Sequence, residues 1–149
     1  RLQRPGDEPD ARVLAAERWE ALRRKYLGRG VEFPAPVLAP GAALPRALFD
    51  SVADNLLQNA LAKRAAQPGI GVSAALLGGG APELRVCDTG SAVPAEVAKS
   101  LLREPVESDN GLGIGLYQAA RQAQASGYAL HLDANRDGEV CFCLRRDAP

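Results

Sequence analysis

Three alternating glycines, Gly111, Gly113 and Gly115, lead directly into a helical pattern that runs to about residue 126. Bare backbone N–H groups and the N-terminus of a helix attract anions, so this stretch predicts one wall of a phosphate site. Two common phosphate-binding motifs are nevertheless excluded. A dinucleotide fingerprint needs a strand before the glycines and a glycine where Leu116 stands, and a Walker A loop needs a lysine after them.

The bulk composition is that of one globular domain. The 149 residues are enough for a single hydrophobic core. Basic and acidic residues number 18 each, and a net charge of zero argues against a protein that coats nucleic acid. No apolar run approaches the length of a membrane span. Because the chain starts with Arg1 and contains no methionine, we expect it to be a fragment of a longer protein.

The hydrophobic periodicity predicts a layered α/β sandwich with much antiparallel pairing. The long central helix carries its apolar residues on one face, at Phe49, Val52, Leu56 and Ala60. In chain order, the predicted elements are a helix over 11–26, a short strand within 31–38, a helix over 45–66, strands over 69–77 and 83–90, a helix over 94–104, the helix after the glycines, and a hairpin of strands 128–134 and 139–146.

Two further features suggest a ligand site. Asn55, Asn59 and Lys63 follow one another at intervals of four residues and therefore lie on one face of the long helix. An amide oxygen suits Mg²⁺, and a lysine there can reach phosphate. Asp88 ends an apolar strand and is followed by Gly90, and a carboxylate in that position can accept a hydrogen bond from an exocyclic amine such as that of adenine.

In this order and spacing, the three features resemble the GHKL (Bergerat) ATP-binding fold, and in particular the catalytic and ATP-binding domain of bacterial sensor histidine kinases. The segments that carry the resemblance are "DNLLQNA" (54–60), "DTGSAVP" (88–94) and "GLGIGL" (111–116). The resemblance covers roughly residues 46–146. It implies an α/β (α+β) two-layer sandwich, with a mixed, mostly antiparallel sheet and helices on one face.

The resemblance also implies ATP and Mg²⁺ as ligands. Asn59 matches the magnesium ligand, with Asn55 and Lys63 near the phosphates, and Asp88 matches the adenine-binding aspartate. The remaining positions implied to bind the nucleotide are Gly90, Val93, Gly111, Leu112, Gly113, Ile114, Gly115 and Leu116.

Asn55 distinguishes a kinase from an ATPase within this superfamily. The related ATPases carry a glutamate at that position, and an amide cannot act as a general base toward water. Phosphoryl transfer needs mainly positioning and charge neutralisation from the nucleotide site. The nucleophile must then lie elsewhere, because the only histidine, His131, falls in a predicted strand.

The resemblance therefore implies a domain that passes the γ-phosphoryl group to a histidine outside this chain, for relay to a response regulator. We expect a homodimeric parent and a cytoplasmic domain, with membrane anchorage of the parent left open. Residues 1–30 are expected to be a linker or the end of a phospho-acceptor helix, and residues 31–149 the catalytic domain.

Two alternatives stay open, the first of them because the chain departs from the family pattern. Ala92 replaces the second glycine of its box, Ala62 stands where a basic residue is usual, and the phenylalanine of the lid is missing, which leaves Leu101 or Val106 to pack there. One alternative is a degenerate GHKL module that acts by protein contact. The other is a serine kinase of the anti-sigma-factor type.

The three cysteines, Cys87, Cys141 and Cys143, lack the paired spacing of a zinc site. Cys141 and Cys143 share one face of a strand, which is a poor geometry for a bond between them. We expect all three to be small buried thiols in a reducing cytoplasm.

Overall fold

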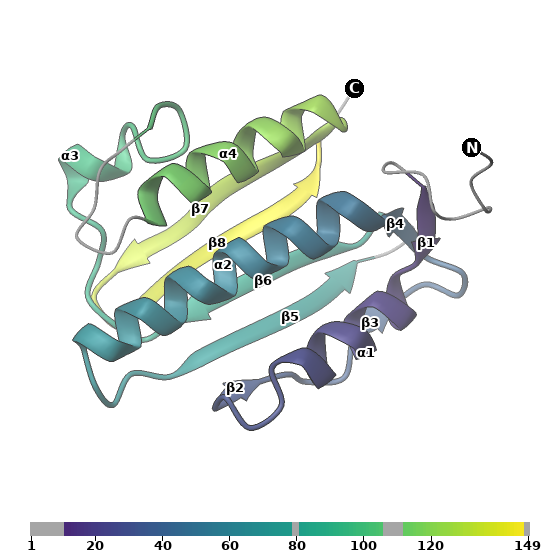
Figure 1. Cartoon of the computed structure of the whole chain (residues 1–149), viewed down its shortest axis with the longest axis horizontal. Helices are drawn as coiled ribbons and strands as arrows, with labels where there is room; N and C mark the ends of the chain where they lie inside the picture. The colour runs from purple at the N-terminus through teal and green to yellow at the C-terminus, as the bar shows by residue number, and fades with distance from the viewer. Residues whose placement is uncertain (1–10, 79–80, 106–111, 148–149) are drawn as a thin grey trace, which may run out of the picture.

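The computed structural model describes residues 11–78, 81–105 and 112–147. Its elements lie in two layers, with the helices packed on one side of a sheet (Figure 1). In chain order they are β1 (Arg12–Leu14), α1 (Ala15–Lys25), β2 (Val31–Glu32), β3 (Val37–Leu38), β4 (Ala43–Pro45), α2 (Arg46–Ala66), β5 (Val72–Gly78), β6 (Glu83–Asp88), α3 (Ala95–Ala98), α4 (Leu112–Ala125), β7 (Tyr128–Arg136) and β8 (Glu139–Arg146).

The main sheet is mixed and mostly antiparallel, as predicted. Its order is β2-β5-β6-β8-β7, and β3 continues along the same edge of β5 as β2. The short strands β2 and β3 run parallel to β5, whereas β5, β6, β8 and β7 pair antiparallel with their neighbours. Strands β6 and β8 therefore form the centre of the sheet.

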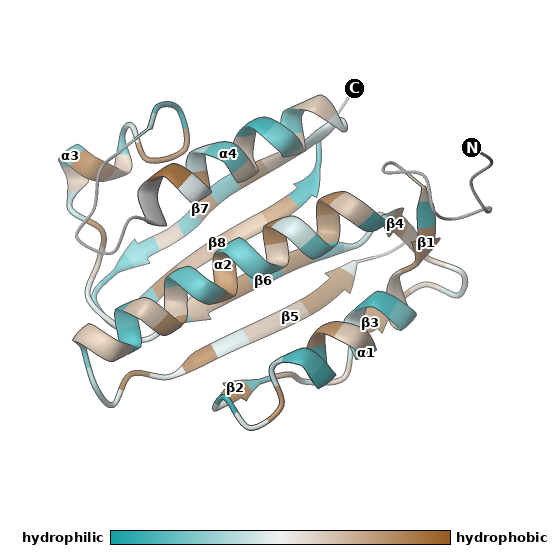
Figure 2. Ribbon diagram, viewed as in Figure 1, coloured by the Kyte–Doolittle hydropathy of each residue, from teal (hydrophilic) through white to brown (hydrophobic). Residues whose placement is uncertain are grey.

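Helix α2 packs across the middle of this sheet. Phe49, Val52, Leu56 and Ala60, the face predicted from periodicity, are at most 3% exposed. Along β6 the burial alternates, so that Leu84, Val86 and Asp88 point toward the helices while the residues between them point away. Figure 2 shows the same division as hydrophobic bands along the strands and alternating hydrophilic and hydrophobic bands on α2.

Helix α1 belongs to the same core. Trp19 is 3% exposed and meets the ring of Phe33 edge to face, at 5.3 Å between centroids. The Arg18 guanidinium donates to both oxygens of Asp50 on α2, and the Tyr26 hydroxyl donates to Asp54. Division of the chain at residue 30 stays a prediction, but helix α1 packs as part of the folded layer.

The structure differs from the predicted elements in three places. A two-stranded sheet of β1 and β4 stands where a helix start and a connector were expected, because each strand satisfies the backbone groups of the other. Helix α3 covers only four residues of the predicted 94–104 helix. Helix α4 already begins at Leu112, so Gly113 and Gly115 lie inside the helix rather than in a loop before it.

Among the described residues, no helix combines the length and the apolar character needed to cross a membrane.

Candidate functional site

A cavity of about 420 Å³ opens between the C-terminal half of α2, the end of β6 and the first half of β8. It also reaches the loop after β6 and the start of α4. Its wall includes the polar residues Asn59, Lys63, Asp88 and Ser91, together with Val93 and Leu116. Its base is apolar, formed by Val140 and Phe142. A mostly apolar pocket with a few convergent polar groups is the usual form of a small-molecule site.

Asp88 is the one buried charged residue of the described core, at 5% exposure. Its Oδ1 accepts a hydrogen bond of 2.9 Å from the Gly90 N–H and lies 2.9 Å from the ammonium of Lys63. A buried carboxylate is tolerated only when it is paired and hydrogen-bonded. The Asp88 carboxylate is thus a fixed hydrogen-bond acceptor in the cavity wall, and it lies at the end of a strand as the sequence predicted.

Lys63 reaches this carboxylate from α2. Its Nζ also donates to the Ser91 carbonyl at 2.5 Å, and its side chain is 17% exposed. The predicted role of Lys63 near phosphate stays a prediction, because the structure places its ammonium at Asp88, inside the cavity. Periodicity set the face of α2 that carries Lys63, and it did not indicate this partner.

The loop after β6 is held by residues that the sequence analysis did not single out. Gln67 and Ser91 bond reciprocally: the Gln67 amide donates to the Ser91 hydroxyl at 2.7 Å, and the Ser91 N–H donates to Gln67 Oε1 at 3.0 Å. Asn135 likewise accepts from the Val93 N–H and donates to the Val93 carbonyl. Asp137 accepts from the Ala92 N–H at 2.9 Å.

Asn135 lies near the end of β7, and Asp137 lies in the turn between β7 and β8. The sequence predicted the hairpin, but nothing local indicated that these two side chains hold a loop 42 to 45 residues away.

Two predicted glycines lie in close contact with side chains of other segments. A Cβ on Gly90 would lie 2.8 Å from both Gln67 Oε1 and Lys63 Cε. A Cβ on Gly115 would lie 2.6 Å from Asn55 Oδ1. Side chains of α2 therefore press against the loop after β6 on one side and against α4 on the other, and each contact depends on a missing side chain.

The two asparagines have different surroundings. Asn55 donates to the Ser51 carbonyl at 3.0 Å, and its oxygen faces Gly115 on α4. Asn59 lies one turn further along α2 and lines the cavity. The three side chains predicted on one face of α2 therefore contact different parts of the site. Asn55 faces α4, Asn59 lines the cavity and Lys63 reaches Asp88.

The other predicted positions differ in where they lie. Val93 and Leu116 line the cavity, as does Leu101, one of the two candidates for the lid packing. Ile114 is 44% exposed on α4. Leu112 and Gly113 contribute backbone to the first turn of that helix, whereas Gly111 and Val106 lie outside the described residues.

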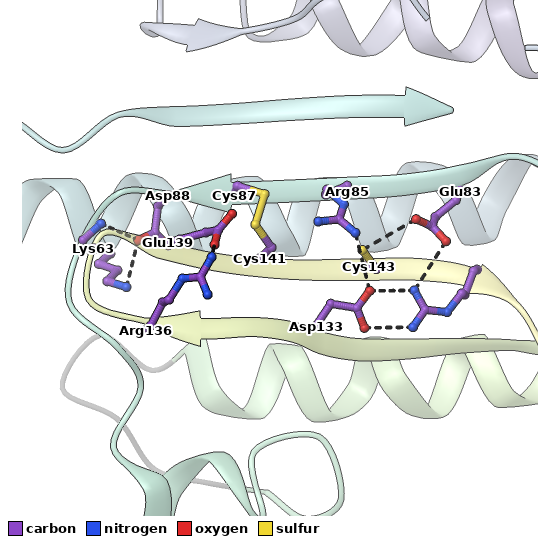
Figure 3. The surroundings of a disulfide bond; sticks show 12 residues. Lys63, Glu83, Arg85, Cys87, Asp88, Asp133, Arg136, Glu139, Cys141 and Cys143 are labelled. Atoms are coloured by element: carbon purple, nitrogen blue, oxygen red, sulfur yellow. Dashed lines mark hydrogen bonds and ion pairs between the residues drawn. A yellow bond between two sulfur atoms is a disulfide. The ribbon is translucent and has the colours of Figure 1, made fainter. Parts of the chain in front are cut away.

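On the opposite face of the same strands, the expectation of free buried thiols was wrong for two of the three cysteines. Cys87 and Cys141 form a disulfide, and only Cys143 is free and buried (Figure 3). The cause is register, because β6 and β8 place Cys87 directly opposite Cys141, with 4.1 Å between their Cα atoms. Disulfides persist mainly in oxidising compartments, so in a reducing cytoplasm the same register would hold Cys87 and Cys141 as two opposed thiols.

A charged cluster continues along that face (Figure 3). The Arg145 guanidinium donates hydrogen bonds to both carboxylate oxygens of Asp133, at 2.7 and 2.8 Å, and to Glu83 at 3.4 Å. The guanidinium lowers the pKa of Asp133 to about 2. Burial, reinforced by the Asp133 carboxylate, raises the pKa of the Cys143 thiol to about 12. These groups face away from the cavity, and we assign them to stability.

No protein-family model matches this chain, and no curated protein matches it in sequence. Solved structures do match it. The nucleotide-free catalytic domain of the histidine kinase ThkA superposes with a TM-score of 0.70 at 13% identity, covering 94% of this chain and 96% of that one. The mycobacterial sensor histidine kinase MprB gives a TM-score of 0.66 at 20% identity, over 93% of this chain and 99% of that one.

Full-length ShkA, solved in complex with AMPPNP, gives a TM-score of 0.70 at 17% identity. The match covers 97% of this chain and 33% of ShkA, so the chain spans about a third of that protein. At these identities the comparisons establish the fold. This chain has the fold of histidine kinase catalytic domains, as the three sequence motifs predicted.

Proposed function

We propose that this chain is the ATP-binding catalytic domain of a sensor histidine kinase, and that it transfers the γ-phosphoryl group to a histidine outside the chain. The observation that carries the proposal is the buried Asp88 carboxylate in the wall of an apolar-based cavity, facing the asparagine-bearing side of α2. The fold of the molecule and the ShkA complex with an ATP analogue support the same function.

The cavity fits a purine nucleotide. Asp88 offers a buried acceptor for an exocyclic amine, and Val140 and Phe142 offer an apolar base on which a flat ring can rest. Gly90 leaves no space for a side chain at the same point. Asn59, on the cavity wall, would hold Mg²⁺, which binds proteins through few oxygen ligands and keeps substrate phosphates and water for the rest. The bound ion would neutralise charge on the phosphates.

Transfer to another group is favoured over hydrolysis because the helix lacks a base that faces the site. Asn55 cannot take a proton from water. The nearest carboxylates on α2 are engaged with α1: Asp50 with Arg18, and Asp54 with Tyr26 and Lys25. Both therefore point away from the cavity.

The remaining partners follow from the same proposal. The acceptor histidine belongs to another domain of the parent, since His131 is an exposed residue of β7. The phosphoryl group then passes to a response regulator, and the parent is a homodimer whose catalytic domain is cytoplasmic. Residues 112–116 of α4 would form the phosphate side of the site, and the predicted contact of Gly111 lies outside the described residues.

Titration calorimetry with Mg-ATP tests the proposal. The wild-type chain should bind ATP saturably, and Asp88→Ala should weaken binding about 100-fold, because hydrogen bonds to a charged group contribute up to about 3 kcal/mol. Asp50→Ala is the matched control on α2 and should bind as the wild type does. With radiolabelled ATP the isolated chain should not label itself.

The outcome also separates the alternatives. Absence of saturable binding in the millimolar range would overturn the kinase proposal in favour of a degenerate module that acts by protein contact. Transfer of label to serine of a partner protein, in place of histidine, would identify the anti-sigma-factor type of kinase.

A further inference from the structure

The ammonium of Lys63 lies beside Asp88, at the position that the proposed function assigns to an amine of the ligand. It lies 2.9 Å from Asp88 Oδ1 and 2.5 Å from the Ser91 carbonyl oxygen. These are two acceptors on the cavity wall, and one of them is the carboxylate to which base recognition is assigned. An exocyclic amine and an ammonium are both N–H donors of similar size, so they compete for the same acceptors.

We propose that Lys63 is an internal competitor for the base: it fills the amine position in the free protein and must leave Asp88 before a purine binds there. The inference rests on the proposed function, because it assumes that Asp88 receives the amine of the base. Lys63 then determines how tightly the base binds. Its effect is to lower the fraction of molecules whose acceptor is open, and the apparent affinity falls by that fraction.

The Lys63 side chain is held in place by close packing against the loop after β6. Its side chain is 17% exposed, and its Cε lies within 2.8 Å of the point where a Cβ on Gly90 would stand. The Lys63 side chain therefore passes close to the backbone of Gly90 before its ammonium reaches the Asp88 carboxylate.

Contacts other than the Lys63 bond to Ser91 also hold the loop that walls the cavity. The loop after β6 is fixed by the Gln67–Ser91 pair, by Asn135 at Val93, and by the hydrogen bond of 2.9 Å from the Gly138 N–H to the Gly90 carbonyl. Asp88 also keeps its hydrogen bond from the Gly90 N–H. Removing the ammonium should therefore open the acceptor without moving it.

The chain offers a matched control. Lys25 forms a second lysine–aspartate pair with α2, at 3.0 Å from Asp54. Its side chain is 60% exposed, and neither partner lines the cavity. Substitution of Lys25 removes the same kind of ion pair while leaving the base site intact.

The first test is the binding of adenosine, which presents the base without phosphates that would attract Lys63 independently. Lys63→Met should bind adenosine about tenfold more tightly than the wild type, since it removes one charge-assisted competitor. Lys63→Gln, which keeps an N–H donor for Asp88 and guards against misfolding of the first variant, should fall between the two. Lys25→Met should match the wild type.

A second test uses the wild-type chain alone. Lysine acetylation by a water-soluble active ester, followed by mass spectrometry, should label Lys63 faster in the presence of saturating adenosine, because the base displaces the ammonium from Asp88. Lys25 should label at an unchanged rate.

Equal or weaker adenosine binding by both Lys63 variants overturns the inference, as does slower labelling of Lys63 with adenosine. If the wild type binds Mg-ATP in either of these cases, the proposed function stands and only the competitor role of Lys63 falls. If neither the wild type nor any variant binds ATP or adenosine, both proposals fall.

Discussion

The two faces of strands β6 and β8 serve different purposes, although their residues alternate along the same chain. Asp88, Val140 and Phe142 point toward the helices and line the cavity. Their immediate neighbours Cys87 and Cys141 point the other way and are joined covalently. The period of two in a β-strand is what places a binding surface and a stabilising surface back to back.

The difference between the faces lies in what a substitution can change. On the cavity side the polar groups are few and each sits against a close neighbour, so changes there should alter ligand binding. On the open side the disulfide and the ion pairs of Arg145 lie away from the cavity, so changes there should alter stability.

The largest effect expected on the open face comes from the disulfide. Replacing both Cys87 and Cys141 by serine should lower the free energy of unfolding by about 4 kcal/mol, because the bond closes a loop with a sequence separation of 54. Denaturant unfolding with and without a thiol reductant measures this. Reductant should destabilise the wild type and leave the variant unchanged. A loss of ATP affinity as large as the loss of stability would contradict the separation of the faces.

On the cavity face, Gly90→Ala should weaken ATP binding about tenfold, since overpacking a close contact costs about 1–3 kcal/mol. The added Cβ meets Gln67 and Lys63 at 2.8 Å and Asp88 at 3.1 Å. Calorimetry of the variant measures the effect. Gly71→Ala is the control, because its Cβ would lie at ordinary contact distance, 3.6 Å, from Thr89. Equal binding by the two variants would remove the steric argument.

Acid should remove the stability that the ionised Asp133 carboxylate contributes through its pairing with Arg145. The pKa of Asp133 is lowered to about 2 by Arg145, so its ionised form stabilises the fold above the unfolded pKa of about 4. That contribution is lost as pH falls from about 4 to about 2, and after allowance for solvent screening it is on the order of 1 kcal/mol. Unfolding of the wild type and Asp133→Asn across this range measures it, and parallel curves would refute the assignment.

The smallest effect expected concerns Cys143, whose modification rate reports its surroundings without changing stability. With its thiol pKa raised to about 12, Cys143 should react with iodoacetamide at pH 8 at least about 100-fold more slowly than a free cysteine, because the thiolate is the nucleophile. Mass spectrometry of the native chain measures the rate. The chain unfolded in guanidinium without reductant is the control and should be alkylated at Cys143 alone.

Much of the fold could be predicted because it depends on local patterns. The apolar face of α2, the alternation along β6 and the hairpin of β7 and β8 each follow from a period that a few consecutive residues display. The β1–β4 pair and the shortened α3 could not be predicted in this way. The first depends on pairing between segments about 30 residues apart, and the second has no side-chain cap hydrogen bond at its start.

For the candidate site, the sequence by itself determined the residue types and the faces on which they lie: Asn55, Asn59 and Lys63 on one side of a helix, and Asp88 at the end of a strand. Only the tertiary structure decided their partners. It brought Lys63 to Asp88, Asn135 to Val93 and Cys87 to Cys141. The physical reason is that helical and strand periods fix direction within one element, whereas contacts between elements depend on register and packing of segments far apart in the chain.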